Sequence, residues 1–441
     1  MKKTILFLFI ILTISELSAQ RTPVCRNGGC DTSPRKHFSL FGKNQFDSNT
    51  IIKYKLEYLQ GEILDHDEKV SPLIMDNTSG FEFAVEFPKY GGKDWFFYYN
   101  FPTVGYGFRY LDLGNPDFLG ESYTVYPYLN LPLINAQLFS FNIKMGAGLA
   151  YLTKKFDPDI YNPNFPEAYE TNNFAISSNL NLYLDLGLNT EIKFSKSRTS
   201  VISRFSLTGD IGLNHFSNGS FSKPNTGLNM VTAGVGIKYS PYLTLVPQKS
   251  GISRMKRQWY YEPVLAVGMN EQHLSDTKKY LNASLNLGAY RPLSNIYRFG
   301  VGLDLFYNQA YFAERTLPDY YAGETNKLRA GVSIANELMF GNFIAGIHVG
   351  AYALNQIEHD GFIYSKIVAK YKIYDNLFLT AAVKTHMEVA ENMEIGLGYF
   401  FTKKEKAPYS WIPEKQKAVK KSGDPDPNRH FLGMRFKKKR M

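Results

Sequence analysis

The chain of 441 residues is rich in aromatic side chains, with 31 Tyr and 33 Phe, which suit β-strands and membrane interfaces. Its formal net charge of +10 does not describe the whole chain, because residues 403–441 hold 13 Lys and Arg against 4 Asp and Glu. When residues 1–19 are also set aside, the remaining residues 20–402 carry no net charge, so we expect no nucleic-acid partner. No run after residues 1–19 approaches the roughly 20 apolar residues of a membrane-spanning helix, which excludes a helical membrane protein.

Residues 1–19 predict a secretory signal peptide. Lys2 and Lys3 provide a positive start, Ile5–Ile14 is an apolar run, and Ala19 is a small residue before the expected cleavage site. Such a run is too short to span a bilayer and is normally removed after export. We therefore expect a mature protein that begins with a periplasmic N-terminal segment over residues 20–48.

This N-terminal segment contains both cysteines of the chain, Cys25 and Cys30. An oxidising compartment allows them to form a small disulfide loop. Two cysteines alone provide too few ligands for a zinc site. No other cluster with metal-ligand spacing and no phosphate-binding glycine loop is present, so we predict no metal and no cofactor.

Most of the mature chain alternates apolar and polar residues with a period of two. In one such stretch Leu281 and Ala283 alternate with Asn282 and Ser284, and the stretches are longer than the usual strands of soluble proteins. The polar side, with its Gly, Asn, Lys and Asp, is poor material for a packed core. We therefore predict an all-β fold, a transmembrane antiparallel outer-membrane β-barrel of about sixteen strands. The strands are expected near residues 49–63, 79–88, 103–113, 120–131, 136–152, 174–194, 198–217, 228–241, 257–270, 279–291, 296–311, 325–338, 341–355, 360–374, 376–388 and 391–402.

The two sets of strands, residues 49–241 and 257–402, can be arranged in two ways. They can close together as one wide barrel, or form an eight-stranded barrel plus a second eight-stranded unit. We favour one closed barrel, since closure leaves no strand edge exposed to lipid. Residues 403–441 lack the alternation and are rich in Lys and Pro, which predicts a basic, flexible periplasmic tail.

Short and long connections alternate along the chain. We expect tight joins at residues 132–134, 340–342 and 374–376, and long loops at 153–173 and 312–324. Bacterial outer-membrane barrels have short periplasmic turns and long outer loops. We therefore place both termini in the periplasm and the long loops outside, in the outer membrane of a Gram-negative bacterium.

Three polar residues interrupt an apolar face at the outer end of two adjacent strands. His215 and Ser217 continue the lipid-facing positions of residues 198–217, and Asn229 is in phase with the lipid-facing positions of the next strand. Polar groups that face hydrocarbon are costly unless they are partnered. An ordinary barrel rim can carry such residues, but their shared phase on two strands favours a functional site.

These residue types suit an esterase. Ser217 is the candidate nucleophile, His215 its general base, and Asn229 the residue that orients the imidazole. Asn218, the Gly219 N–H and Asn225 are candidates to stabilise the oxyanion.

At this point the sequence resembles a known family. His215-x-Ser217-Asn218, followed by Pro224-Asn225-x-Gly227, looks like the PagL family of lipid A 3-O-deacylases. The longer acyloxyacyl hydrolase-like relatives in Bacteroidetes are closer still. The stretches at residues 94–95, 110–115 and 149–156 also resemble that family, and the resemblance covers residues 50–240. It implies an outer-wall site that removes an ester-linked acyl chain from lipid A, without a required metal. The family's triad has an acid where this chain has Asn229, and the family's barrel has eight strands.

Two other functions stay open. The His-x-Ser-Asn-Gly start with Asn229 also resembles outer-membrane phospholipase A, a family that uses calcium near its site. Ser220 and Asn225 are neutral here, which does not favour calcium, and Pro224-Asn225-x-Gly227 favours the deacylase. The third function is non-enzymatic, a channel or structural barrel with a degenerate site.

Overall fold

The computed structural model describes residues 51–401 except 91–92, 163, 165–168, 198–199, 242–256, 272–273, 275–277, 313–327, 356–360 and 387–388. The expected signal peptide, the N-terminal segment with Cys25 and Cys30, and the basic tail lie outside the described residues. The described part contains sixteen strands, one short α-helix, α2 (Asp94–Tyr98), and four 3-10 turns, which confirms the predicted all-β fold and strand number. The strands are β1 (Lys53–Ile63), β2 (Thr78–Pro88), β3 (Thr103–Asp112), β4 (Glu121–Asn135), β5 (Phe139–Leu152), β6 (Leu180–Lys193), β7 (Phe205–Ser217), β8 (Leu228–Tyr239), β9 (Tyr260–Asn270), β10 (Tyr280–Pro292), β11 (Tyr297–Asn308), β12 (Leu328–Phe340), β13 (Phe343–Leu354), β14 (Ile363–Lys372), β15 (Leu377–His386) and β16 (Val389–Tyr399).

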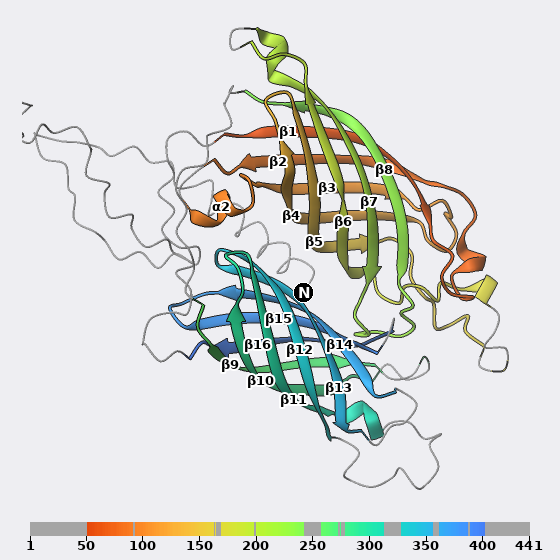
Figure 1. The fold of residues 1–441 in the computed structure, drawn as a ribbon. Coiled ribbons are helices and arrows are strands. Elements are labelled where there is room, and N and C mark those ends of the chain that lie inside the picture. Colours follow the sequence, from red (N-terminus) through yellow and green to blue (C-terminus); the bar gives the residue numbers. More distant parts are fainter. Residues whose placement is uncertain are drawn as a thin grey trace, which may run out of the picture. The chain divides into compact units, whose positions relative to one another are not determined.

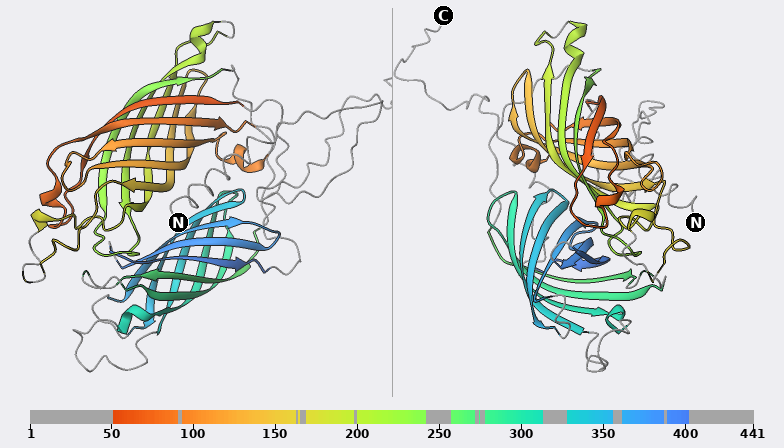
Figure 2. Two further views of the ribbon diagram at one scale, coloured as in Figure 1. Left: turned by 180° about the vertical axis from the view of Figure 1, so that it is seen from behind. Right: turned by 90° about the vertical axis from the view of Figure 1, so that its right-hand side faces the viewer.

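The strands close into two separate barrels, β1–β8 and β9–β16 (Figures 1 and 2). Each strand pairs antiparallel with the next, and closure occurs where β8 pairs with β1 and β16 pairs with β9. The alternative of two eight-stranded units is therefore observed, and the single wide barrel that we favoured is not formed. Two closed barrels leave no free strand edge either, because each ladder closes on itself. Eight strands enclose a lumen narrow enough for side chains to fill.

Buried ion pairs fill the lumen of the first barrel around Glu82. The Glu82 carboxylate lies 2.7 Å from Lys55 Nζ, 2.6 Å from Arg109 Nη2 and 3.4 Å from Lys144 Nζ. Lys144 also lies 3.1 Å from the Asp185 carboxylate, and all of these side chains are buried. A buried charge is tolerated when it is paired in this way. The inward positions that looked unsuitable for a soluble core therefore form a core of paired charges.

The second barrel has a similar polar interior built from different residues. Glu262 binds Arg298 and Lys370, with a distance of 3.0 Å to the Lys370 ammonium. Asp304 accepts hydrogen bonds from Lys366 at 2.6 Å and from Tyr364 at 2.8 Å. In both barrels these inward charges are thus paired with one another.

The outer faces carry exposed aliphatic and aromatic side chains in alternation with these buried polar ones. Leu56, Leu186 and Leu213 in the first barrel and Leu265 and Leu303 in the second are more than half exposed. This inversion of the soluble pattern is what a barrel surrounded by lipid requires. No helix in the described part of the chain is both long and apolar enough to cross a bilayer.

One expected tight join was misplaced. We expected the turn after the fourth strand at residues 132–134, but β4 continues to Asn135 and its register shifts between Pro132 and Ile134. Proline has no N–H to donate to a strand ladder, and an irregularity in pairing accommodates it. The turn itself follows at Ala136, whose N–H donates to the Phe139 oxygen at 2.8 Å.

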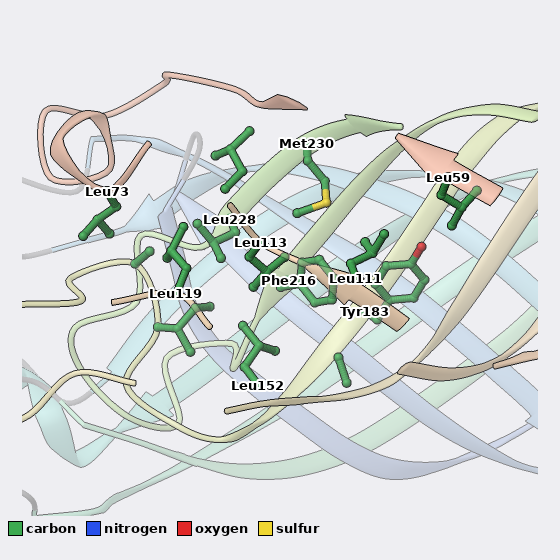
Figure 3. Packing of buried hydrophobic residues seen from close by; sticks show 14 of the residues in the cluster. Leu59, Leu73, Leu111, Leu113, Leu119, Leu152, Tyr183, Phe216, Leu228 and Met230 are labelled. Carbon is green, nitrogen blue, oxygen red and sulfur yellow. The ribbon is translucent and has the colours of Figure 1, made fainter. Parts of the chain in front are cut away.

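A cluster of buried apolar residues, here called the plug, lies in the first barrel, and Figure 3 shows how its side chains pack. It combines strand residues with residues of the connections after β1, β3 and β5, at the end opposite the short turn between β4 and β5. Its members include the connection residues Leu73, Leu119 and Ile176, together with Phe216 of β7 and Leu228 of β8. The plug therefore fixes the strand ends that carry the candidate site.

Candidate functional site

His215 and Asn229 lie directly opposite each other in the β7–β8 pair. The Nδ1 atom of His215 is 2.6 Å from Oδ1 of Asn229. An amide oxygen only accepts hydrogen bonds, so His215 Nδ1 carries the proton and donates it. The neutral ring then has an unprotonated Nε2, as a general base requires.

Ser217 is the last residue of β7 and shares the face of His215. Its Oγ accepts hydrogen bonds from the Gly219 N–H at 3.0 Å and from Asn225 Nδ2 at 3.2 Å. Within the described residues, no hydrogen bond joins Ser217 to His215. Proton transfer between them therefore requires the Ser217 hydroxyl to turn toward the imidazole.

The loop after Ser217 brings the other expected residues together. Asn225 Oδ1 accepts a hydrogen bond from the Asn218 N–H at 2.9 Å, while its Nδ2 binds Ser217. The Asn218 side chain points elsewhere and donates to Ser177 Oγ at 3.0 Å. Gly219 and Asn225 thus contact the candidate nucleophile directly, whereas Asn218 reaches it through Asn225. Ser177 was not predicted as a site residue: the strand expected at residues 174–194 includes it, but β6 begins only at Leu180, and Ser177 lies in the connection before it.

Gly227 packs against the imidazole of His215. A Cβ atom at Gly227 would lie 2.9 Å from His215 Cε1, and the residue has a φ of +80°. Its N–H donates to the Ala175 oxygen at 3.0 Å. Only glycine combines this backbone conformation with such a close approach.

Inward-facing neighbours hold the site residues in place. Phe216 stands between His215 and Ser217 and packs against Tyr183 with ring centroids 5.0 Å apart. Leu228 precedes Asn229, and both Phe216 and Leu228 are fully buried in the plug. Adjacent residues of a strand point to opposite faces, so this burial fixes the orientation of the outer face.

Two family models match the chain. The model described as "Lipid A 3-O-deacylase (PagL)" matches residues 79–238, and the model described as "Acyloxyacyl hydrolase, C-terminal domain" matches residues 259–404. The chain belongs to the PagL family. The resemblance found in the sequence is thereby confirmed, and the two matches divide the chain between the two barrels.

Other comparisons add little to the PagL family assignment. A mutant porin of Rh. blastica is 12% identical, with 80% of this chain and 99% of the porin covered, at a TM-score of 0.15. The siderophore receptor PirA of Acinetobacter baumannii is 7% identical, with coverages of 80% and 81% and a TM-score of 0.24. Scores this low carry no argument. None of the curated proteins matches the chain.

The sequence prediction has Asn229 at the position where the PagL family's triad has an acid. Asp210 does not supply the missing carboxylate, because it is buried on the lumen side, 3.3 Å from Lys144 Nζ. Among the described residues, no group of three or more His, Cys, Asp or Glu side chains has a geometry suited to a metal ion. The groups that contact Ser217 Oγ are the backbone N–H of Gly219 and the side-chain amide of Asn225.

Proposed function

We propose that this PagL-family protein is an outer-membrane esterase that removes an ester-linked acyl chain from lipid A, of the 3-O-deacylase type. Ser217 is the nucleophile, His215 the general base and Asn229 the residue that orients the imidazole. The observation that carries the proposal is the His215–Asn229 hydrogen bond, which leaves Nε2 free on the face that Ser217 shares. We also propose that the expected signal peptide directs export and that the barrels, with their apolar outer walls, then insert into the outer membrane of a Gram-negative bacterium, where lipopolysaccharide is the natural source of substrate.

The acylation step follows from these groups. His215 Nε2 takes the proton of the Ser217 hydroxyl while Oγ attacks the acyl carbonyl carbon. Collapse of the tetrahedral intermediate breaks the ester bond, and the imidazolium gives its proton to the departing sugar oxygen, which leaves as a hydroxyl group. Asn229 holds the ring in one tautomer throughout, although an amide stabilises the imidazolium less than a carboxylate does.

The donors around Ser217 suit the intermediate. The Gly219 N–H and Asn225 Nδ2 both point at Oγ, so an oxyanion on the carbon bonded to Oγ lies within their reach. The Asn218 N–H, which binds Asn225 Oδ1, becomes a third donor if Asn225 turns. Water then attacks the acyl-serine with His215 again as base, which releases the fatty acid.

The surroundings of the site favour a lipid substrate. His215 is paired across the strands with Leu184 on one side, and Leu213 precedes it on the same face. Both leucines are exposed on the outer wall. An acyl chain lying against this wall brings its ester toward Ser217, at the end of the barrel where the long connections lie.

Mass spectrometry of lipid A tests the proposal. Lipid A from cells that express the protein should lack one ester-linked acyl chain, and the chain should be retained with Ser217→Ala. The Ser217→Ala variant must reach the outer membrane in a folded form at the wild-type level. Identical acyl patterns for the two folded proteins would refute the proposal.

A phospholipase A activity is the alternative, and Asn229 is the observation that favours it. Release of fatty acid from phospholipid vesicles, measured with calcium and with a chelator, separates the two activities. Turnover of phospholipid without any change in lipid A would support the phospholipase. The side chains that fill both lumens do not favour the third function, a channel.

A further inference from the structure

The loop that follows Ser217 in the first barrel contacts the second barrel. Both barrels belong to one compact unit of the structure, residues 46–441. The Ser220 oxygen accepts a hydrogen bond from the Glu271 N–H at 3.1 Å. Ser220 Oγ in turn donates to the Ala390 oxygen at the start of β16. A Cβ atom at Gly219 would lie 3.1 Å from Cβ of Met393. The loop therefore lies against the strand ends of the second barrel.

Glu271, the residue directly after β9, makes the main contacts to this loop. Its Oε2 atom accepts hydrogen bonds from the Lys223 N–H at 2.7 Å and from Ser222 Oγ at 3.0 Å. Its Oε1 atom lies 2.6 Å from Lys279 Nζ, and that ammonium group also donates to the Phe221 oxygen. The residue is 4% exposed, so these bonds are what compensates its buried charge.

The same loop carries the groups that contact Ser217. The Gly219 N–H donates to Ser217 Oγ, and the Ser222 N–H donates to Asn218 Oδ1 at 3.3 Å. One face of the loop thus meets the candidate nucleophile and the other face meets Glu271. A movement of the loop at its contacts with Glu271 therefore also displaces the Gly219 N–H that binds Ser217 Oγ.

The backbone of the loop gives a second, independent indication. Ser220 has a φ of +63°, a left-handed conformation that is unfavourable for a residue with a side chain. Such a conformation persists where surrounding contacts impose it. The contacts that hold Ser220 on both its oxygen atoms come from the second barrel.

We propose that the second barrel positions the oxyanion side of the site, and that Glu271 is the positioning residue through which it acts. Glu271 is not a catalytic residue, because the loop stands between its carboxylate and Ser217. The inference rests on the proposed esterase function. It gives the second barrel, which matches a separate family model, a role in the reaction of the first.

The experiment compares Glu271→Ala and Glu271→Gln with wild type in the full-length protein. The matched control is Glu394→Gln, because Glu394 is a buried carboxylate of the same barrel whose contacts do not include this loop among the described residues. Deacylation of purified lipid A gives kcat and KM, and labelling by a serine-directed fluorophosphonate reports the reactivity of Ser217. Heat-induced unfolding in detergent reports folding.

We expect Glu271→Ala to lower kcat by about 100-fold, the effect of a displacement of roughly 1 Å, with KM changed little. Glu271→Gln keeps one acceptor and should lie between this variant and wild type. The labelling of Ser217 should slow in the same order, while Glu394→Gln should match wild type in kcat and labelling. Should Glu271→Ala fail to fold, Ser222→Ala removes one bond from the loop side and should lower kcat in the same direction.

Two results overturn the inference. Wild-type kcat in folded Glu271→Ala, or an equal loss in Glu271→Ala and Glu394→Gln, shows that Glu271 does not position the site. Failure of the proposed function is distinguishable, because wild type and Ser217→Ala would then be equally inactive on lipid A. An active wild type, an inactive Ser217→Ala and a fully active Glu271→Ala refute only the role of Glu271.

Discussion

The imidazole of His215 and the amide of Asn229 form a 2.6 Å hydrogen bond across the β7–β8 pair, on the face opposite the apolar plug. The bond orients the ring as a carboxylate would but brings no negative charge. It therefore separates two contributions that a triad acid makes together, namely orientation of the general base and stabilisation of the imidazolium.

Substitution of Asn229 should separate these contributions. Asn229→Ala removes the acceptor of the Nδ1 proton, and a loss of about 1.5–3 kcal/mol of stabilisation lowers kcat by roughly 10- to 100-fold. Asn229→Asp keeps the acceptor and adds charge, so kcat should equal or exceed that of wild type. Deacylation kinetics on lipid A with the three folded proteins provide the measurement. Equal rates in Asn229→Ala and wild type would exclude a role for the amide.

Gly227→Ala should impair the site through the His215 ring. The new Cβ atom would lie 2.9 Å from His215 Cε1, and the left-handed backbone adds about 1–2 kcal/mol of strain. Both the thermal midpoint and kcat should fall. Gly361→Ala is the matched control, because Gly361 has a φ of +70° with no atom within 4 Å of the added Cβ.

The control should lose stability without losing activity. If Gly227→Ala keeps the wild-type kcat, the close packing of this residue on His215 has no catalytic consequence. If Gly361→Ala loses activity to the same extent, strain alone accounts for the effect.

Glu82 should be essential to the stability of the first barrel. Glu82→Ala leaves the ammonium and guanidinium groups of Lys55, Arg109 and Lys144 without their shared partner. Removal of one partner from a buried pair costs about 3–5 kcal/mol. Denaturant unfolding in detergent, followed by circular dichroism, measures the change against Glu68→Ala, an exposed loop carboxylate. A difference below about 1 kcal/mol between the two variants would show that the network relaxes around the loss.

The packed lumens predict a protein that does not conduct ions. Arg109 in the first barrel and Arg298 in the second are fully buried and bound to carboxylates. Purified protein in planar bilayers should therefore give no stepwise conductance, under conditions in which a porin does. Discrete conductance steps would instead support the non-enzymatic channel.

The sequence was sufficient for features that depend on neighbouring residues. The period of two predicts sixteen strands, as observed, and the shared phase of His215, Ser217 and Asn229 predicts a common face without knowledge of the strand pairing. Both are local properties, because alternation and hairpin pairing follow directly from the order of residues along the chain. The same alternation places Asp210 on the lumen side, where the structure has it buried beside Lys144.

The features that the sequence did not predict depend on distant segments. β8 pairs with β1, which closes the first barrel, and not with β9, which would continue a wider one. The alternation of apolar and polar residues is the same in both arrangements, so it does not distinguish them. The contacts of Asn218 with Ser177 and of Lys223 with Glu271 join irregular loops, whose positions no periodic pattern records. The sequence predicts Asn225 as a residue that stabilises the oxyanion, but its hydrogen bond to the Ser217 hydroxyl depends on how the loop folds, which the sequence pattern does not show.

Lys223 gives a prediction on substrate charge and pH. Burial lowers the pKa of its ammonium group, and the nearby Lys69 lowers it further, while Glu271 and Glu391 act in the opposite direction. Two neighbouring cations on loops beside the site suit a phosphorylated headgroup. Lys223→Gln should therefore raise KM for lipid A by about 2- to 5-fold at neutral pH, the effect of one partly exposed ion pair. It should not change KM for lipid A whose phosphates have been removed.

The direction of the pH effect follows from the lowered pKa. Lys223 loses its charge at a lower pH than an ordinary lysine, whose pKa is about 10.4. In wild type, KM for phosphorylated lipid A should consequently begin to rise at a pH lower than an ordinary lysine would cause. Lys223→Gln should lack this rise. Steady-state kinetics at a series of pH values, with both substrates and both proteins, measure the difference. Superimposable pH profiles for the two proteins would show that the Lys223 ammonium does not contact the headgroup.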